Sequence, residues 1–130
     1  MSLESRTHSE VNVGDALPEL AIPLTTSLIV SGAIASRDFT PVHHDKAAAQ
    51  ASGVPDVFMN ILTTNGLVGR YVTDWAGPNA KIRNVQIKLG TPNTAGDTMT
   101  FNGSVTSKDQ DQVTIELAGK NAWGDHVTAS

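Results

Sequence analysis

The sequence predicts an α+β fold in which one antiparallel sheet wraps round a single long helix. Three observations support this prediction. Residues 56–75 carry apolar side chains at steps of three and four, which is the period of a helix with one buried face. After Pro78 the pattern changes to alternation of apolar and polar residues, broken by polar loops of hairpin length. The chain has 130 residues, which suits one domain, since domains commonly contain about 100–150 residues.

The first part of the chain is predicted to contain an edge strand and a short helix. Residues 1–15 are expected to form a poorly ordered lead-in, so that a single domain spans residues 16–130. Residues 17–25 mix prolines with alternating apolar residues and predict an edge strand, where proline is tolerated. Residues 27–36 fit strand or helix, and their glycine and β-branched residues favour a strand that leads into a turn. Residues 45–51 predict a short helix.

The long helix is predicted over residues 56–75, with Asp56 as its N-cap and Gly77 beyond its end. Gly66 and Gly69 each cost roughly 1 kcal/mol in a helix interior relative to alanine. We therefore expect a sheet close against these two glycines, because close packing would compensate for that cost.

The strands after the helix are predicted from period-two alternation. They are expected around residues 82–87, 98–105, 113–117 and 126–130, with loops at 93–96 and 108–111 and a turn at Gly124–Asp125. Because the helix covers one face of such a sheet, the sheet edges are free to pair with a second subunit. We therefore expect the protein to dimerise.

The composition argues against several functional classes. The formal net charge is −4 and no basic run occurs, so the chain lacks the clustered cations that non-specific nucleic-acid binding uses. The chain has no cysteine, which rules out disulfides, thiolate zinc sites and cysteine nucleophiles. No apolar run approaches the roughly 20 residues of a membrane-spanning helix, and the polar N-terminus lacks the apolar stretch of a secretory signal. We expect a cytoplasmic protein that does not contact membranes.

Asp38 and His43 are the candidate catalytic residues. Pro41 lies between them, stiffens the link and disfavours helix at Thr40. A bent segment of this kind can turn both side chains toward one point, where a carboxylate and an imidazole make an acid/base pair for one water molecule. The spacing alone also fits a simpler role, in which Asp38 caps a turn.

The segment Asp38-Phe39-Thr40-Pro41-Val42-His43 resembles the hydratase motif of MaoC-like and (R)-specific enoyl-CoA hydratases, which reads D-x-N-P-aliphatic-H. Residues 44–50 resemble the short helix that follows this motif in the family, and residues 60–75 resemble the family's central helix. Gly96-Asp97-Thr98 resembles a turn that precedes a strand in the family. The similarity covers about residues 15–130, and its elements come in the family's order.

The resemblance implies a hot-dog fold and the hydration of a trans-2-enoyl-CoA to a 3-hydroxyacyl-CoA, with coenzyme A as part of the substrate and no separate cofactor. Asp38 and His43 would activate the water, and backbone N–H groups near Asn60 would stabilise charge on the thioester oxygen. Asn60, Thr40 and Thr63 are the candidate substrate-binding residues. The chain departs from the family by having Thr40 where asparagine is usual, and Met59-Asn60 where a small His-Gly pair is usual.

Within the family, the chain is most similar to small subunits of actinobacterial steroid side-chain enoyl-CoA hydratases. This similarity rests on residues 37–39, 42–45, 60–63, 70–78 and 124–129. It implies a steroid side-chain thioester as substrate and a larger MaoC-domain chain as partner in a heteromer. A homodimer is the alternative assembly.

Two other functions are compatible with this family. A non-catalytic MaoC-like subunit of a heteromeric hydratase would keep the fold without using the Asp38–His43 pair. A hot-dog acyl-CoA thioesterase would use a carboxylate on or near the central helix, for which Asp56 and Asp74 are the candidates. Neither has a histidine near it in the sequence, so the Asp38–His43 segment favours hydration.

Cations for the coenzyme A phosphates would come from the helix end or the strand after it. The available residues are Arg70, Lys81, Arg83 and Lys88, each of which is also consistent with an ordinary solvated charge. Asn65 and Thr63 could line a polar substrate tunnel or face a partner.

The remaining histidines and tryptophans have simpler interpretations. His44 has no third ligand at metal-binding spacing, so no metal site is predicted there and a solvent-facing or supporting role is expected. His126 is expected to be structural, and Trp75 and Trp123 are expected to anchor the core or an interface.

Overall fold

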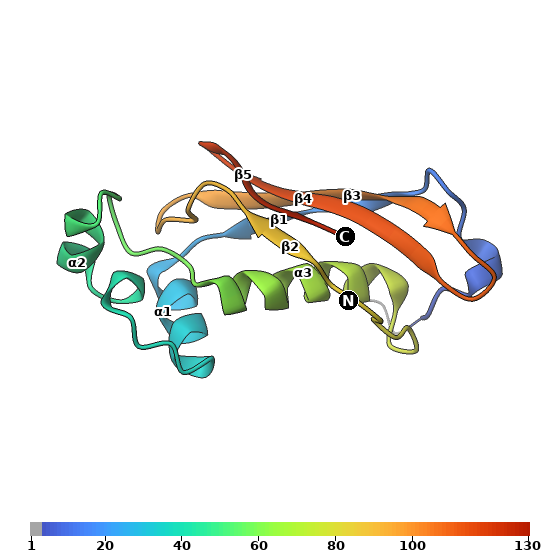
Figure 1. The fold of residues 1–130 in the computed structure, drawn as a ribbon, viewed down its shortest axis with the longest axis horizontal. Coiled ribbons are helices and arrows are strands. Elements are labelled where there is room, and N and C mark those ends of the chain that lie inside the picture. The colour runs from blue at the N-terminus through green and yellow to red at the C-terminus, as the bar shows by residue number, and fades with distance from the viewer. Residues whose placement is uncertain (1–3) are drawn as a thin grey trace.

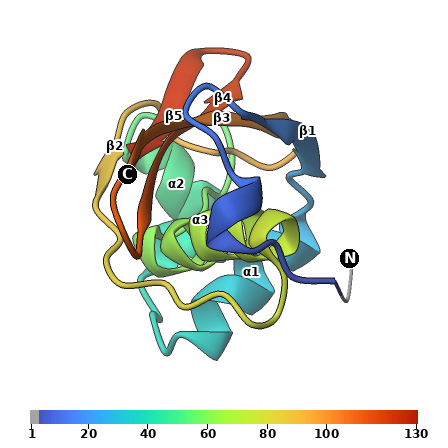
Figure 2. The same ribbon diagram turned by 90° about the vertical axis from the view of Figure 1, so that its right-hand side faces the viewer.

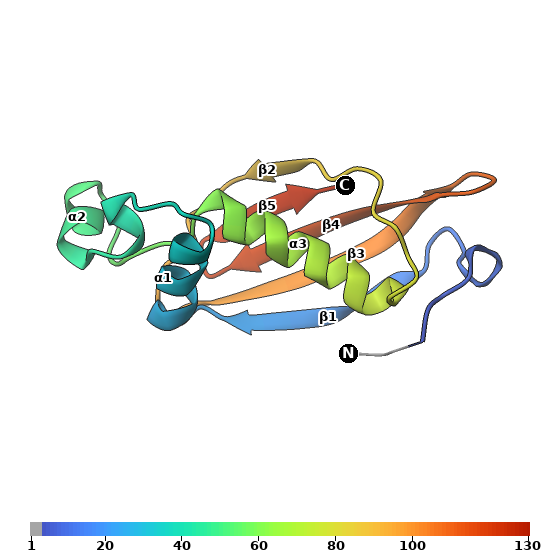
Figure 3. The ribbon, with the colours of Figure 1, turned by 90° about the horizontal axis from the view of Figure 1, so that it is seen from below.

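The computed structural model describes residues 4–130 and contains one five-stranded antiparallel sheet packed on a central helix (Figure 1). The strand order is β1-β3-β4-β5-β2. The elements are η1 (His8–Glu10), β1 (Ala16–Pro23), α1 (Thr26–Ala35), η2 (Pro41–His43), α2 (Lys46–Ala51), α3 (Ile61–Ala76), β2 (Ile87–Leu89), β3 (Thr98–Lys108), β4 (Val113–Asn121) and β5 (Gly124–Ala129). Seen from below, α3 runs obliquely across the sheet, and α1 and α2 lie beyond the end of the sheet where α3 begins (Figure 3).

One face of α3 forms the centre of the core. Val68, Tyr71 and Trp75 are buried on this face, as the three- and four-residue period predicts. The ring of Tyr71 stacks on Phe101 of β3, with 5.0 Å between ring centroids and 16° between planes. The view along the molecule shows the sheet curving over α3 on one side (Figure 2).

The long helix begins at Ile61, five residues later than predicted, because Asn60 and not Asp56 is its N-cap. The Asn60 side chain accepts a hydrogen bond from the Thr63 N–H. Asp56 instead accepts from the next residue's N–H and pairs with Lys46 at 3.5 Å. Both residues are good helix caps, so sequence preference did not distinguish them.

The segment predicted as a strand over residues 27–36 is helix α1. The side chain of Thr25 accepts a hydrogen bond from the Leu28 N–H and caps the helix. Ile29 and Ala33 are buried on one face of α1, but the other apolar residues lie on other faces, and Ile34 among them is exposed. This lack of periodicity explains why the pattern did not distinguish helix from strand.

The strands after α3 match the predictions in part. The expected strands over residues 98–105 and 113–117 are confirmed as β3 and β4, which extend further. The prediction of a strand around residues 82–87 is wrong for most of its length, since β2 spans only Ile87–Leu89. Gln86, just before β2, also exchanges two backbone hydrogen bonds with Ser130. The last strand starts at Gly124, and the turn lies at residues 122–123, not at Gly124–Asp125.

The sheet expected against the helix glycines is absent from those positions. A Cβ built on Gly66 would meet nothing within 4 Å, and one on Gly69 would only reach the Ile82 side chain at 4.0 Å. Gly66 is exposed and Gly69 is half-buried, and no strand packs closely against either glycine.

Residues 4–15, expected to be loose, lie against the domain. The Arg6 N–H donates to the Ala76 carbonyl at the end of α3, and Val11 is 4% exposed within the core. The first three residues of the predicted lead-in lie outside the described residues. Throughout residues 4–130, every helix is too short or too polar to cross a membrane.

Candidate active site

The end of α1 directs Asp38 toward the start of α3. The N–H of Arg37 donates to the Ile34 carbonyl and the N–H of Asp38 donates to the Ala33 carbonyl, which is the Schellman pattern of a helix end. Arg37 takes the left-handed position of this motif with φ of 59°, where glycine is usual. The chain therefore turns sharply immediately before Asp38.

His43 is held by η2 and by the strand-like segment before α3. Its Nδ1 lies 2.6 Å from the Phe58 carbonyl oxygen. The His43 and Phe58 rings pack edge to face, with 5.1 Å between ring centroids and 81° between planes. A carbonyl oxygen can only accept, so Nδ1 carries a proton. In neutral His43 the other ring nitrogen, Nε2, therefore presents a lone pair.

Asp38 and His43 meet as the sequence predicts, with 3.3 Å between Asp38 Oδ2 and His43 Nε2. The other carboxylate oxygen, Oδ1, accepts from the Thr40 hydroxyl at 2.7 Å and from the Thr40 N–H at 3.2 Å. Hydrogen bonds from Thr40 and then Asn60 hold the pKa of Asp38 below its usual value. Asp38 is thus ionised near neutral pH, and two acceptors converge on a position that suits a donor such as water.

Thr40, Asn60 and Thr63 all lie next to the pair, but their polar groups are used within the protein. The Thr63 hydroxyl donates to Asn60 Oδ1 at 2.6 Å. Asn60 is 2% exposed, and its side-chain N–H groups donate to Ser36 and Asp38. The Asn60 side chain is therefore fully engaged within the protein, whereas Thr40 is exposed. The substrate-binding roles of Asn60, Thr40 and Thr63 stay predictions.

The first turn of α3 offers backbone donors beside the pair. The first four N–H groups of a helix have no partner within the helix. The Asn60 side chain accepts from one of them, the Thr63 N–H, while the Thr64 N–H makes the first bond of the helix to the Asn60 carbonyl. Among residues 4–130, no acceptor bonds the N–H groups of Ile61 and Leu62, and the positive end of the helix dipole favours an anionic one.

The side chains around the pair are unusually apolar for an open surface. Asp38 is 24% exposed, so the pair is accessible. The segments that carry it also carry four exposed large apolar residues, here called the apolar collar: Ile34, Phe39, Ile61 and Leu62. Each is at least half exposed, and Phe39, next to Asp38, is 65% exposed. Large apolar residues left exposed on adjoining segments favour a surface that another molecule covers.

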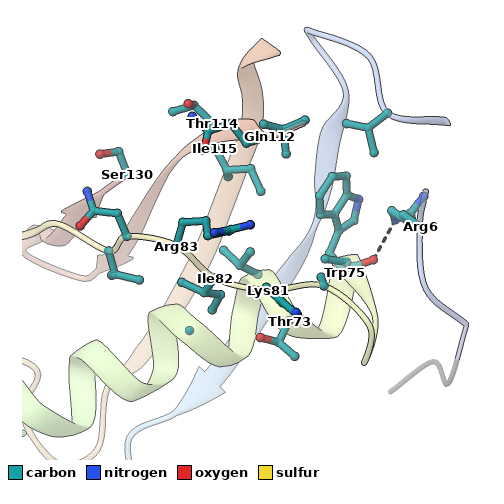
Figure 4. Close-up of a pocket in the computed structure, with 18 of the residues that line it drawn as sticks. Arg6, Thr73, Trp75, Lys81, Ile82, Arg83, Gln112, Thr114, Ile115 and Ser130 are labelled. Carbon is teal, nitrogen blue, oxygen red and sulfur yellow. Dashed lines mark hydrogen bonds between the residues drawn. The ribbon is translucent and has the colours of Figure 1, made fainter. Parts of the chain in front are cut away.

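A partly open cavity of about 470 Å³ lies at the other end of α3, with neither Asp38 nor His43 in its lining. Figure 4 shows it between Trp75 on α3, Ile115 on β4 and Arg83 on the segment before β2. Because a helix rises about 1.5 Å per residue, Trp75 lies roughly 22 Å along α3 from Asn60. His8 and Asp111 also line the cavity, but no contact joins their side chains among residues 4–130, and His8 Nε2 lies 2.6 Å from the Asp109 carbonyl instead. The Asp38–His43 pair therefore marks the candidate active site.

The candidate cations for coenzyme A are dispersed. Lys81 and Arg83 line the cavity just described, and Arg70 pairs with Asp74 at 3.3 Å on α3. Lys88 lies on β2, and none of the four neighbours the Asp38 carboxylate. Which cations reach the phosphates stays a prediction.

The other histidines singled out in the sequence and the two tryptophans differ in how far they are buried. His44 is exposed, with its Nε2 3.2 Å from the Phe39 carbonyl. His126 is 2% exposed, in agreement with the structural role expected for it. Trp75 is in the core, whereas Trp123 is 52% exposed. In the described part of the chain, no three metal-binding side chains gather into a possible ion site.

Sequence reasoning missed three groups of this site. They are the Phe58 carbonyl, the Ser36 hydroxyl and the left-handed turn at Arg37. A backbone carbonyl has no signature in the sequence, and Arg37 stands where glycine would have given a signal. Only Ser36, a small polar residue at the end of an apolar segment, could have been suspected.

A single antiparallel sheet wrapped round one helix is the hot-dog fold, and solved hydratases share it. The R-hydratase PhaJ1 from Pseudomonas aeruginosa has a TM-score of 0.85 at 20% identity, covering 94% of this chain and 80% of its own. The (R)-hydratase from A. caviae involved in PHA biosynthesis has a TM-score of 0.83 at 20% identity, covering 92% of both chains. The predicted fold class is confirmed, and at such identity the likeness concerns the fold alone.

The family follows from the sequence match. Residues 11–129 match the family described as "MaoC like domain", and the chain belongs to it. The 3-oxo-4,17-pregnadiene-20-carboxyl-CoA hydratase beta subunit of Mycobacterium tuberculosis is 52% identical over 118 residues, 91% of this chain and 92% of that subunit. A chain in the crystal structure of the ChsH1-ChsH2 complex from M. tuberculosis has a TM-score of 0.89 at 52% identity, covering 91% of this chain and 93% of its own. The family supports a hydratase-type activity.

Proposed function

We propose that this chain is the catalytic subunit of an enoyl-CoA hydratase that adds water to a trans-2-enoyl-CoA to give a 3-hydroxyacyl-CoA. The observation that carries the proposal is the 3.3 Å approach of Asp38 Oδ2 to His43 Nε2, with Nδ1 of the histidine committed to the Phe58 carbonyl. A water molecule that donates to both acceptors is held and polarised at this point.

The chemistry divides between the two side chains. Neutral His43 accepts a proton from the water at Nε2, while ionised Asp38 orients the water and stabilises the imidazolium that forms. The water oxygen bonds to C3, and the C2–C3 π pair moves toward C2 and the thioester oxygen. The imidazolium then returns the proton from Nε2 to C2, so that one water is added in total.

Charge on the thioester oxygen needs donors near the pair. The N–H groups of Ile61 and Leu62 at the start of α3 supply them in this proposal, with support from the helix dipole. Removing one such donor in other enzymes costs about 10²–10³ in rate. Backbone donors need no particular side chain, so the family departure at Met59-Asn60 does not argue against this role.

The apolar collar supports a bulky apolar acyl group and a second chain at the site. The M. tuberculosis relative is named as a hydratase subunit for a pregnadiene-carboxyl-CoA, and the similar solved chain belongs to a two-component complex. We propose a steroid side-chain thioester as the substrate and a larger MaoC-domain chain as the partner. A homodimer is the alternative assembly.

The test is an assay of this chain co-purified with a larger MaoC-domain chain from the same genome, following loss of enoyl-thioester absorbance with a steroid and a short-chain trans-2-enoyl-CoA. Asp38→Asn and His43→Ala should each lower kcat by about 10²–10⁴-fold, the usual contribution of general acid–base catalysis. His44→Ala is the matched control, since His44 is exposed and bonds only the Phe39 carbonyl among the described residues.

The alternatives give different results. Full activity in both variants, with the complex intact, would contradict the proposal and leave a non-catalytic subunit. Release of free thiol from the acyl-CoA would indicate a thioesterase, and the chain has no cysteine to disturb a thiol assay. Asp56 and Asp74, the carboxylates for that chemistry, pair with Lys46 and Arg70 and have no histidine partner in the described residues.

A further inference from the structure

The side chain of Asn60 lies where three segments of the candidate active site meet. We propose that Asn60 is a positioning residue, whose amide holds the Asp38 carboxylate with Oδ2 directed at His43. The inference rests on the proposed function and gives a specific role to a residue that was predicted only to bind substrate.

The orientation of the Asn60 amide follows from its partners. One atom of the amide lies 3.1 Å from the Thr63 N–H, which can only donate, so that atom is the oxygen. The other atom is therefore the NH₂ group. It lies 3.2 Å from Asp38 Oδ2, to which it donates, and 2.9 Å from the Ser36 hydroxyl. No rotated amide satisfies the same neighbours.

Ser36 ties the amide to α1. The Ser36 hydroxyl donates to the Gly32 carbonyl at 2.7 Å and to the Ala33 carbonyl at 3.2 Å, so its lone pairs are left to accept from Asn60. With the Thr63 N–H and hydroxyl bonded to its oxygen, Asn60 uses all of its polar atoms. A fully bonded amide that is 2% exposed has one orientation.

A glycine lets the two helices approach closely enough for this network. A Cβ at Gly32 would overlap the Thr63 hydroxyl, and its next contact with that side chain would be at 2.8 Å. The end of α1 can therefore reach the start of α3. Asp38 follows α1 by three residues and so arrives beside the N-cap of α3.

Asparagine is the residue that suits both tasks. Serine, threonine, aspartate and asparagine are all good N-caps, because each offers an oxygen to the first-turn N–H groups. Asparagine alone adds an NH₂ group that can donate to a carboxylate and a hydroxyl at once. The same bond, after those from Thr40, keeps the pKa of Asp38 low, and His43 is the titratable side chain that faces the carboxylate.

The test uses two variants that keep the cap and lose the donor. Asn60→Asp places a second carboxylate within hydrogen-bond distance of Asp38, and Asn60→Ser leaves a side chain too short to reach it. In the assembled complex both should lower kcat by about 10–100-fold with KM changed by less than about threefold, since small misplacements of a catalytic group cost up to about 10²-fold. In Asn60→Asp the acidic limb of kcat/KM should also move to higher pH, because a like charge raises the pKa of Asp38.

Thr25→Ala is the matched control, because it removes the N-cap of α1 and leaves the Asp38 contacts in place. It should lower thermal stability and leave kcat, KM and the pH profile unchanged. A ¹³C titration of the Asp38 carboxyl in the folded protein gives a readout without turnover, and its pKa should rise in both Asn60 variants.

The outcomes separate this inference from the proposed function. One outcome is that Asp38→Asn and His43→Ala lose activity while both Asn60 variants keep the parent kcat and the parent Asp38 pKa. This result overturns the positioning role of Asn60 and leaves the proposed function in place. If Asp38→Asn and His43→Ala keep full activity, the proposed function is overturned. The positioning role of Asn60 in catalysis is then overturned as well. Loss of kcat that is matched by Thr25→Ala would reduce Asn60 to a structural cap.

Discussion

The buried pair of Thr64 and His126 allows a stability prediction with a magnitude. Thr64 on α3 is fully buried, and its hydroxyl lies 2.8 Å from His126 Nε2. The other ring nitrogen, Nδ1, lies 2.7 Å from the Thr91 carbonyl, so Nδ1 carries the proton and Nε2 accepts from Thr64. Thr64→Val keeps the shape of the side chain and removes this donor, which leaves a buried imidazole nitrogen unsatisfied.

The loss follows from two opposing effects. A buried acceptor without a partner costs about 1–3 kcal/mol. Burying one more methyl group returns about 0.8 kcal/mol. The net loss should be about 0.2–2.2 kcal/mol. Unfolding entropy is about 2.1 cal/mol/K per residue, so for 130 residues the Tm should fall by about 1–8 °C.

Thermal unfolding followed by circular dichroism measures this difference. Thr128→Val on β5 is the matched control, because Thr128 is exposed and its replacement should change stability by less than about 0.5 kcal/mol. A Thr64→Val protein as stable as the parent would show that the hydrogen bond to His126 contributes nothing, and the reasoning from burial would be refuted.

Two further predictions concern backbone packing and pH. Gly66→Ala should raise the free energy of unfolding by about 0.5–1 kcal/mol, because nothing lies within 4 Å of the added Cβ. Gly32→Ala should lower it by about 1–3 kcal/mol and reduce hydratase activity, because the added Cβ overlaps Thr63. Urea unfolding distinguishes them, and equal effects would refute the packing argument. Burial lowers the pKa of His126, so its contribution to stability is fully present above the unfolded pKa of about 6.5 and declines as the pH falls toward the folded pKa. Urea midpoints at about pH 8, 6 and 5 should show this decline, and a His126→Asn variant whose midpoints fall equally would assign the decline to other groups.

The sequence predicted the parts of the fold that have a clear period. Residues 98–105 and 113–117 alternate, and β3 and β4 follow. The buried face of α3 was also predicted, whereas its start was not, because Asp56 and Asn60 are both acceptable caps. Residues 27–36 have no period, and only packing against the start of α3 through Gly32 shows why they form a helix.

The sequence predicted that Asp38 and His43 lie together, but not the contacts that surround them. The motif placed Asp38 and His43 together, and their side chains meet at 3.3 Å. The role of Asn60 could not be predicted, because it depends on a contact with Asp38 across 22 positions of the chain. The tautomer of His43 depends on the Phe58 carbonyl, and every residue type carries a carbonyl.

The different protonation states proposed for Asp38 and His43 follow from what each is bonded to. Asp38 accepts bonds from Thr40 and Asn60 and lies near the positive end of α3, so its charged form is favoured. His43 donates from Nδ1 to a carbonyl, so its neutral form keeps a lone pair at Nε2 for the water. If the bonds to Asp38 were lost, its pKa would rise and the shared proton could settle on the carboxylate. The carboxylate would then no longer stabilise the imidazolium. The hydrogen bonds behind the pair are therefore part of the proposed acid/base chemistry, and Asn60 is the one among them that also sets where α3 begins.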